Sequence, residues 1–472
     1  MIKQREYNDN AVRMMMYPAM GFLILGLLVG LFISLNVYVW PNYFVGQYIH
    51  FGRLRPLHVS TVLFLWLLSS GIGVMYFIVQ RLTSRPLWSA KLARYSAWGW
   101  WFVVPLGVLS LPFGTNFGWE YAELPMFVSY IPTKLLFLIV WIMIATNIIM
   151  TVFQKNNEML YVSLWYFLGM CFWTAVVVFV GFFVINWVPQ GISRVNVNFF
   201  YVHNIVGFIF TPIGLGTAYY ILPRVLQKPL YSHSLSMLGF WTLAFVYTWV
   251  GSHHIIHGPV VQWLQTLSIV FSMWLIIPVL SVVMNLFLTM KGAWLTRMND
   301  VRVKLIMFGT LLYLVVSIQG SFMALRHVNE ITSKTDWVIG HAHLALMGTF
   351  TFFAYAAFFH IIPVISRAPL ALPKVAMTSV NCSIYGILIY VFSLSIGGYL
   401  QGMQWARWAK GQTYVDYQSE LSKLSFLDTL GDVRIWWMLR ALGGAIFLLG
   451  AILFIFSMVS TIKHNTKNEV TS

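Results

Sequence analysis

The sequence predicts an all-α integral membrane protein, built as a single bundle of twelve transmembrane helices. Hydrophobic residues make up 59% of the 472 residues and charged residues only 9%, whereas about a quarter of the residues in an ordinary soluble protein are charged. The apolar residues also gather in runs of about 20, the length of a helix that crosses the hydrocarbon core of a bilayer. No stretch has the composition of a soluble domain, so we expect one membrane domain over residues 1–472.

The apolar runs follow one another along the chain and are separated by polar segments. The expected spans are 15–40, 57–80, 89–112, 126–152, 160–188, 199–222, 235–256, 264–290, 303–325, 336–365, 376–401 and 436–461. The first run is too long for a signal peptide and has no cleavage site, so it is expected to be a spanning helix. Residues 402–435 are expected to form an external loop, which either covers the bundle or binds a partner.

Basic residues predict the orientation, because loops retained in the cytoplasm carry an excess of Lys and Arg. Such residues occur at both ends of the chain and after the second and eighth spans: Lys3, Arg5, Arg13, Arg81, Arg85, Lys91, Arg94, Lys291, Arg297, Arg302, Lys304, Lys463 and Lys467. Both termini are therefore expected in the cytoplasm. The net charge of +16 reflects this topology, and no basic groove or motif predicts nucleic-acid binding. The two cysteines lie in apolar runs, which excludes a disulfide framework, a haem c attachment motif and a thiolate cluster.

Six of the twelve histidines are expected at one depth, in the outer half of the bundle. They are His58, His203, His253, His254, His341 and His343. A single histidine in a helix bundle is usually a hydrogen-bonded structural residue, but ionisable residues are costly in a membrane, and six at one level indicate a function. His341 and His343 are two residues apart, so on a helix they point to nearly opposite faces and each would hold its own ligand.

Imidazole nitrogen suits copper, iron and zinc. His253 and His254, joined by His203 from the neighbouring span, would make a three-nitrogen metal site with one position open. A bis-histidine haem needs two opposed imidazoles, which His58 and one residue of the 341/343 pair can supply. The other residue of that pair would hold a second haem whose far face points at the three-histidine metal.

Four sequence blocks carry a family resemblance: GRLRPLHVSTVLF (52–64), FFYVHNIVGF (199–208), VYTWVGSHH (246–254) and TDWVIGHAHLALMG (335–348). They resemble the catalytic subunit of haem-copper oxidases, specifically the C-family or cbb3-type cytochrome c oxidases. The resemblance implies His58 and His343 as axial ligands of a low-spin haem b and His341 as proximal ligand of a high-spin haem b. It implies His203, His253 and His254 as copper ligands.

The resemblance further implies a terminal respiratory oxidase of the bacterial inner membrane that reduces dioxygen to water. Electrons would come from membrane-anchored c-type cytochrome subunits, with protons taken up from the cytoplasm and proton pumping. A channel for these protons would include Thr211, Tyr219 and Ser236, although hydroxyls in membrane helices commonly bond backbone carbonyls.

Tyr247 lies seven residues before His254, two helical turns earlier on the same face, which would aim its phenol beneath the metal. A packing role is the alternative. The resemblance implies a covalent link to His203, with Tyr247 supplying an electron and a proton when the O–O bond breaks. Four arginines, Arg55, Arg326, Arg434 and Arg440, could clamp haem propionates or extend to lipid headgroups; Arg440 matches best.

The sequence departs from the family at three places. Gln319 stands where the family has a glutamate near the proximal histidine; it can accept the imidazole N–H without charge, so we expect a higher haem potential or altered proton handling. Pro125, after Glu123, stands where a second carboxylate is expected, which weakens the carry-over of the family's calcium site. His257 is one residue later than the family's additional histidine and is assigned no role.

Two other functions remain open. A nitric oxide reductase would share the six histidines but hold iron in place of copper, and that iron needs a glutamate, which is missing within two turns of His203. A non-catalytic membrane b-type cytochrome or a transporter would use its histidines as an electron conduit or a proton relay. An electron conduit needs haem ligands but no metal site such as the one that His203, His253 and His254 would form.

Overall fold

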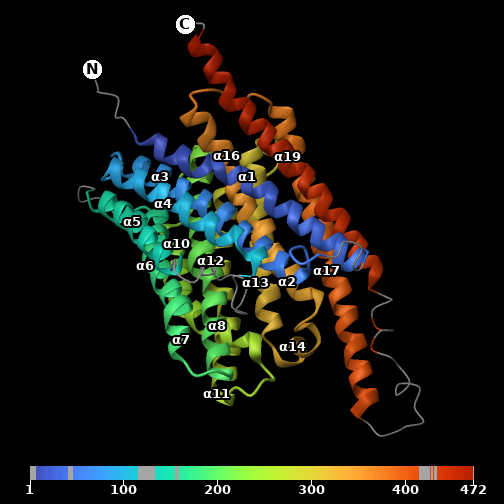
Figure 1. Cartoon of the computed structure of the whole chain (residues 1–472). Helices are drawn as coiled ribbons and strands as arrows, with labels where there is room; N and C mark the ends of the chain where they lie inside the picture. The colour runs from blue at the N-terminus through green and yellow to red at the C-terminus, as the bar shows by residue number, and fades with distance from the viewer. Residues whose placement is uncertain are drawn as a thin grey trace.

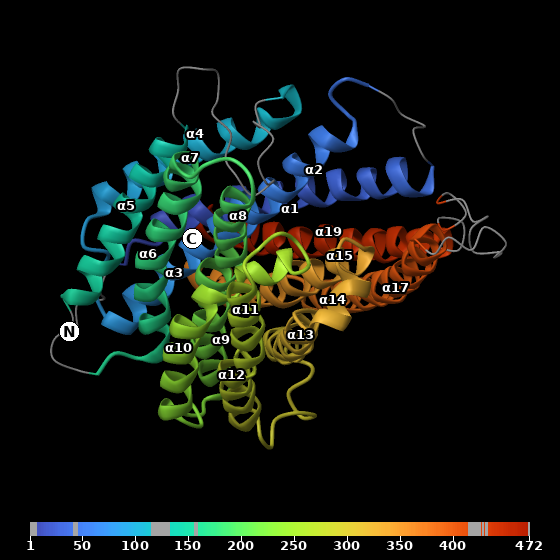
Figure 2. The ribbon, with the colours of Figure 1, turned by 90° about the horizontal axis from the view of Figure 1, so that it is seen from below.

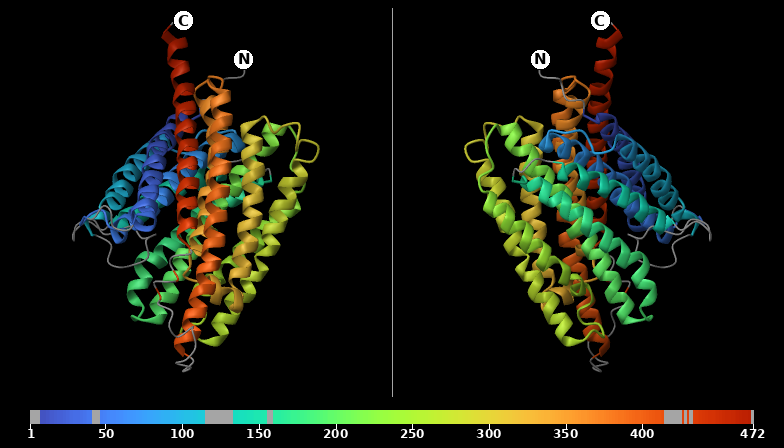
Figure 3. Two further views of the ribbon diagram at one scale, coloured as in Figure 1. Left: turned by 90° about the vertical axis from the view of Figure 1, so that its right-hand side faces the viewer. Right: turned by 90° about the vertical axis from the view of Figure 1, so that its left-hand side faces the viewer.

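The computed structural model describes residues 7–40, 46–114, 133–154, 159–413, 426, 429 and 433–470, without the side chains of 410–413 and 465–470. Every regular element in this part of the chain is helical. Twelve helical segments of the described chain are long and apolar enough to cross a membrane, which confirms the predicted fold class and the number of spans. Helix α1 begins and helix α19 ends at the same end of the bundle (Figures 1 and 3), as an even number of spans requires. The cytoplasmic location of that end stays a prediction.

Most spans are interrupted helices. The first four consist of α1 (Asp9–Ile33) with η1 (Ser34–Val39); α2 (Phe51–Ser60), η2 (Thr61–Leu68) and α3 (Ser69–Thr83); α4 (Ala90–Leu109) with η3 (Leu111–Phe113); and α5 (Thr133–Phe153). The next four are α6 (Val162–Phe179), η4 (Val180–Val184) and α7 (Ile185–Trp187); α8 (Ile192–Ile205), η5 (Val206–Phe210) and α9 (Thr211–Leu226); α10 (His233–Val246) with η6 (Tyr247–Trp249) and η7 (Gly251–Ile255); and α11 (Gln262–Trp274) with α12 (Ile276–Thr289). The last four are α13 (Val301–Met323); α15 (Asp336–His343), η8 (Leu344–Phe350) and α16 (Thr351–Ile365); α17 (Pro373–Thr413); and α19 (Arg434–Val470), with the short helix α14 (Arg326–Thr332) before α15.

Three spans form the interior. In the second, sixth and tenth spans 83% to 94% of the most apolar stretch is buried, against at most half in every other described span. Helix α9 of the sixth span packs against α3, α6, α12, α13 and α16, and Figure 2 shows it beside α12. The three interior spans carry His58, His203, His341 and His343, so these histidines belong to the centre of the bundle.

Each interior span contains a π-helical segment just after a histidine: η2 follows His58, η5 follows His203 and η8 follows His343. In a π turn the backbone bond reaches one residue further than in an α turn. Hydroxyl groups at the ends of these segments bond the carbonyl five residues earlier. The pairs are Ser69 to Phe64 (2.9 Å), Thr211 to Val206 (3.0 Å) and Thr351 to Leu346 (2.8 Å). The hydroxyls thus satisfy carbonyls at the transition, and π segments of this kind are frequent at functional sites.

The boundaries differ from prediction at several places. The α-helix expected over 235–256 ends at Val246, and residues 247–255 form two 3₁₀ segments. Residues 402–413 continue α17 and 434–435 begin α19, so most of what remains of the expected external loop lies outside the described residues. Glu123 and Pro125, on which the calcium prediction rests, also lie outside them.

Candidate functional site

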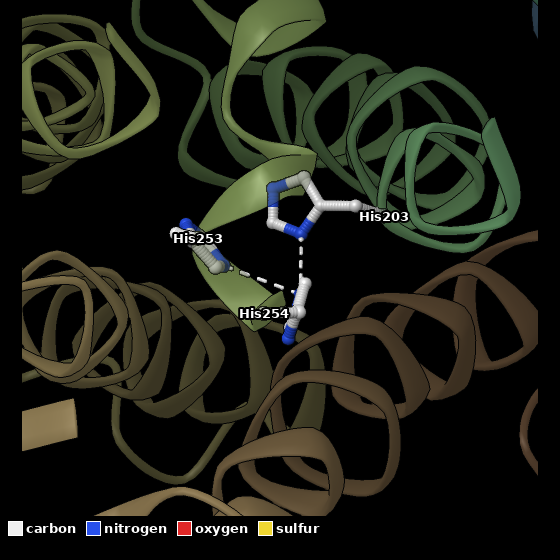
Figure 4. Close-up of side chains that lie close together, drawn as sticks. All are labelled: His203, His253 and His254. Atoms are coloured by element: carbon white, nitrogen blue, oxygen red, sulfur yellow. Dashed lines mark hydrogen bonds between the residues drawn. The ribbon is translucent and has the colours of Figure 1, made fainter. Parts of the chain in front are cut away.

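The three-histidine cluster joins two parts of the chain, since His203 comes from α8 whereas His253 and His254 come from η7 (Figure 4). Nδ1 of His203 lies 3.2 Å from Nε2 of His254, and Nε2 of His253 lies 3.2 Å from the same atom. One nitrogen of each ring lies within 4.8 Å of the others. Tetrahedral ligands about 2.0 Å from an ion would be about 3.3 Å apart. The cluster therefore fits one metal ion held by three nitrogens, with a fourth position open.

A hydrogen bond determines which nitrogen of His253 faces the cluster. Ser272 Oγ donates to the carbonyl of Ser268 at 2.6 Å and lies 2.8 Å from Nδ1 of His253. Since the hydroxyl proton is already used, Ser272 Oγ accepts from the Nδ1–H of His253, and the lone pair of that ring sits on Nε2. Such a partner fixes the ring orientation and the tautomer that a metal ligand needs.

Gly251 allows η7 to approach α8 closely. A Cβ at this position would lie 2.7 Å from the backbone oxygen of Phe199. The ring of Phe199 in turn lies parallel to that of His254, with centroids 5.0 Å apart. The contact between these two backbone segments brings the 253/254 pair to His203.

Tyr247 lies directly beside a cluster histidine. Its ring and that of His203 are nearly parallel at 18°, with centroids 4.7 Å apart. Gly207, one turn after His203, makes the space for this ring, because a Cβ there would overlap it. Nε2 of His203, which faces away from the cluster, is buried and has no hydrogen-bond partner among the described residues. The structure thus brings Tyr247 to His203, but from a 3₁₀ segment, so the prediction that Tyr247 and His254 share an α-helical face is wrong.

His58 and His343 face each other across the interior. Their rings are nearly parallel at 15°, with centroids 6.1 Å apart. Nδ1 of His58 lies 2.7 Å from the carbonyl of Gly26, and Nδ1 of His343 lies 2.8 Å from that of Ile339. Both Nδ1 atoms therefore donate, and both lone pairs sit on Nε2. Two imidazoles each about 2.0 Å from a shared ion would have centroids about 6 Å apart, so the pair fits the axial positions of one haem.

His341 belongs to the other side of α15. Its Nδ1 lies 3.1 Å from Oε1 of Gln319, which accepts the N–H and leaves the Nε2 lone pair for a ligand. His341 lies close enough to the three-histidine cluster to interact electrostatically with each of those rings. All six histidines are only half-buried although they lie inside the bundle. Each of these residues therefore keeps some surface that no described protein atom covers, as residues that hold a cofactor require.

Of the four candidate arginines, Arg440 differs from the others. It is 3% exposed, and its Nη2 is buried without a hydrogen-bond partner among the described residues. Arg55 and Arg434 are exposed, and Arg326 donates to Oε1 of Gln265 at 2.8 Å. An unpaired guanidinium N–H inside the bundle fits a carboxylate of a bound group, so Arg440 suits a haem propionate best.

The three proton-path residues are all buried. Thr211 Oγ1 donates to the carbonyl of Val206 at 3.0 Å, which is the structural role that hydroxyls in membrane helices commonly have. Ser236 Oγ accepts from Nδ2 of Asn285 at 2.8 Å, and the buried hydroxyl of Tyr219 interacts with both of these side chains. The sequence analysis did not identify Asn285, although a polar amide inside an apolar span was a signal for a functional residue. The structure shows that this side chain is fully buried.

Tyr161 lies beside this path at the border of the membrane segment, and its hydroxyl donates to the carbonyl of Tyr219 at 2.6 Å. Burial raises the pKa of Tyr161 to about 12, so the phenol stays a donor at neutral pH. His257 is exposed, and its Nε2 lies 3.2 Å from the carbonyl of Arg326, away from the cluster.

Comparisons with known proteins identify the family and the fold. The family described as cytochrome c and quinol oxidase polypeptide I matches residues 10–446. The cbb3-type cytochrome c oxidase subunit CcoN1 of Stutzerimonas stutzeri is 30% identical over 466 residues, which cover 97% of this chain and 95% of that protein. A bacteroid cytochrome c oxidase subunit 1 homologue of Bradyrhizobium diazoefficiens is 28% identical over 476 residues, covering 97% of this chain and 83% of that protein. A solved haem-copper terminal oxidase dimer shares the fold, with a TM-score of 0.73 at 15% identity over 96% of this chain and 83% of that one.

Proposed function

This chain belongs to the haem-copper oxidase subunit I family, and we propose that it is the subunit in which a cbb3-type cytochrome c oxidase reduces dioxygen to water. The observation that carries the proposal is the meeting of His203, His253 and His254 in one cluster with the ring of Tyr247 against it. An electron conduit would need the haem ligands but neither of these features.

The residues divide into two ligand sets. His58 and His343 would hold a low-spin haem b through Nε2, while their Nδ1 atoms donate to backbone carbonyls. His341 would hold a high-spin haem b, with the three-histidine cluster holding copper on its far side. When bound, the high-spin haem and the copper supply the redox chemistry that transfers electrons to dioxygen.

Tyr247 would supply a proton from its phenol oxygen to the reacting oxygen. The free Nε2 of His203 is the atom that a covalent link to Tyr247 would use. Ser236 and Tyr219, together with Asn285, would return protons from the end of the bundle that holds the chain termini. We place that end in the cytoplasm, which makes proton uptake cytoplasmic and allows the reaction to drive proton pumping.

Electrons must come from other subunits. The chain has only two cysteines, Cys171 and Cys382, and neither belongs to a CxxCH motif, so it carries no attached haem c. The proposed donors are membrane-anchored c-type cytochrome subunits in the bacterial inner membrane. Membrane lipid covers the remaining apolar surface.

The test compares two histidine variants of the purified complex. His254→Ala removes the nitrogen that the other two cluster rings approach, and His257→Ala removes an exposed imidazole nearby that makes no contact with the cluster. We expect His254→Ala to lose copper and oxygen consumption but to keep the low-spin haem spectrum, and His257→Ala to match the parent. Equal copper content in the two variants would contradict the proposed metal site.

The carbon monoxide difference spectrum tests the high-spin haem separately. A haem held only by His341 keeps a free face and binds carbon monoxide, so the reduced parent should show this spectrum. If no haem of the complex binds carbon monoxide, the chain is a non-catalytic cytochrome. The cluster contains no Asp or Glu among the described residues, which disfavours a nitric oxide reductase.

A further inference from the structure

Asp336 and Arg440 are the only acidic or basic residues that are buried in the described part of the chain, at 5% and 3% exposed. A charged group within a membrane span is costly to bury and indicates a function. Asp336 stands at the first position of α15, where the positive end of the helix dipole stabilises a carboxylate. The dipole alone accounts for an acidic residue there, but it does not account for the burial or for the cation beside it.

Three contacts hold Asp336 in place. Its Oδ2 accepts from Nε1 of Trp437 at 2.6 Å, and its backbone N–H donates to Oε1 of Gln401 at 2.9 Å. Its Oδ1 lies 3.9 Å from Nη1 of Arg440. Asp336 therefore connects α15 to α17 and α19, and it fixes where α19 presents Arg440.

Arg440 is held but not saturated. Its Nε donates to Oγ of Ser34 at 3.3 Å, and its guanidinium lies 3.9 Å from the centre of the Tyr38 ring. The separation from Asp336 is too long for a direct hydrogen bond, and Nη2 has no partner within the described chain. The pair thus keeps donor capacity for one more anion.

Asp336 and His343 lie on one face of α15. They are seven residues apart, which is two helical turns and about 10 Å along the axis. The ring of Tyr390 lies 4.8 Å from that of His343, and the charges of both Asp336 and Arg440 act on Tyr390. The buried carboxylate is therefore part of the immediate electrostatic surroundings of His343.

We propose that Asp336 is a positioning residue for the haem held by His58 and His343: it aims Arg440 at a haem carboxylate, and its negative charge lowers the midpoint potential of the iron. A negative charge favours the oxidised iron, and in a buried site the effect is only weakly screened. The inference rests on the proposed function, because it requires a haem between these two histidines.

The experiment is a redox titration of the low-spin haem in the purified complex with its cofactors. Asp336→Asn keeps the shape of the side chain and an oxygen for Trp437 but removes the charge. We expect the haem content and the bis-histidine spectrum to be retained and the midpoint potential to rise. The matched control is Glu330→Gln, which removes one negative charge from an exposed position on α14 and should leave the potential unchanged. An unchanged potential in Asp336→Asn with the haem in place would overturn the inference.

The variant Trp437→Phe distinguishes the effect of the Asp336 charge from a purely structural role of Asp336. It breaks the same link between α15 and α19 but leaves the carboxylate. If Asp336 only holds helices together, both variants lose thermal stability and neither shifts the potential; we expect that only Asp336→Asn raises it. A rise of equal size in Trp437→Phe would overturn the inference.

Asp336→Glu covers the case in which Asp336→Asn fails to retain haem. If the Asp336→Glu complex contains haem and has a midpoint potential close to the parent's, the result supports a role for the negative charge. If this variant also loses haem, the inference is overturned, because the shape of the side chain and not its charge would then be what the site requires. Failure of the proposed function looks different, because it shows in the parent before any variant is made: the parent then lacks copper or a haem that binds carbon monoxide. A parent without a bis-histidine haem spectrum would remove the haem on which the inference rests.

Discussion

Substitution of Gly207 by alanine tests whether the position of Tyr247 beside His203 matters for catalysis. A Cβ at Gly207 would overlap the Tyr247 ring, at Cε1, Cδ1 and Cζ. Carbon atoms in contact lie about 3.5–4.0 Å apart, so the ring or the backbone must move by more than about 1 Å. Crowding of this kind in a packed interior costs about 1–3 kcal/mol.

The ring of Tyr247 has only limited freedom to move without leaving His203, since the two centroids are 4.7 Å apart. A displacement of about 1 Å in a catalytic group can lower the rate about a hundredfold. We therefore expect Gly207→Ala to retain haem and copper but to consume oxygen about a hundredfold more slowly. Peptides that span His203 and Tyr247, examined by mass spectrometry, should lose the covalent link that we propose for the parent.

The control is Gly21→Ala on α1, where an added Cβ meets no atom within 4 Å. This variant should match the parent in oxygen consumption, haem content and copper content. If Gly207→Ala retains the parent's turnover, Tyr247 does not act from the position that the structure shows. If it loses copper as well, the change acts through the metal site and the reasoning about the tyrosine fails.

Three further predictions follow from single contacts. Gln319→Glu places a negative charge at the atom 3.1 Å from Nδ1 of His341, so a redox titration should show a lower midpoint potential of the high-spin haem. An unchanged potential would mean that the contact between residue 319 and His341 does not control the potential of this haem. Tyr219→Phe removes a buried hydroxyl that interacts with Ser236 and Asn285, and oxygen consumption should fall about a hundredfold if this hydroxyl transfers protons, while the haem spectrum stays unchanged. Burial would raise the pKa of the Asp300 carboxyl, but the hydrogen bonds and charge of Arg302 outweigh it and hold that pKa below its usual value. Asp300 caps α13, so Asp300→Ala should cost about 1 kcal/mol of stability at neutral pH. Because the carboxylate stabilises the native state above its unfolded pKa of about 3.9, this cost should shrink as the pH falls through the lowered native pKa, in thermal unfolding of the detergent-solubilised complex.

The sequence predicts the spans well because length and apolarity alone determine whether a helix can cross a bilayer. It also predicts which histidines meet, because depth in the membrane can be counted from the end of each span. The geometry within the spans could not be predicted in this way. The π segments depend on hydroxyls such as those of Thr211 and Thr351, which bond carbonyls five residues earlier, and no hydropathy pattern reports such a bond.

Tyr247 shows the limit most clearly. The sequence places it near the cluster by assuming an unbroken α-helix, whereas the chain leaves that helix at Val246. Its contact with His203 depends instead on the space above Gly207 and on the close approach of Gly251 to Phe199. Contacts between spans of this kind follow from tertiary packing, which the periodicity of one span does not contain.

The content of metal and haem in the purified complex tests the central claim most directly. Elemental analysis together with the haem spectrum should give one copper ion for every two haems b held by this subunit, since three imidazoles form the copper site and three more bind the two haems. An iron ion beyond the two haem irons, with no copper, would contradict the account and identify the chain as a nitric oxide reductase.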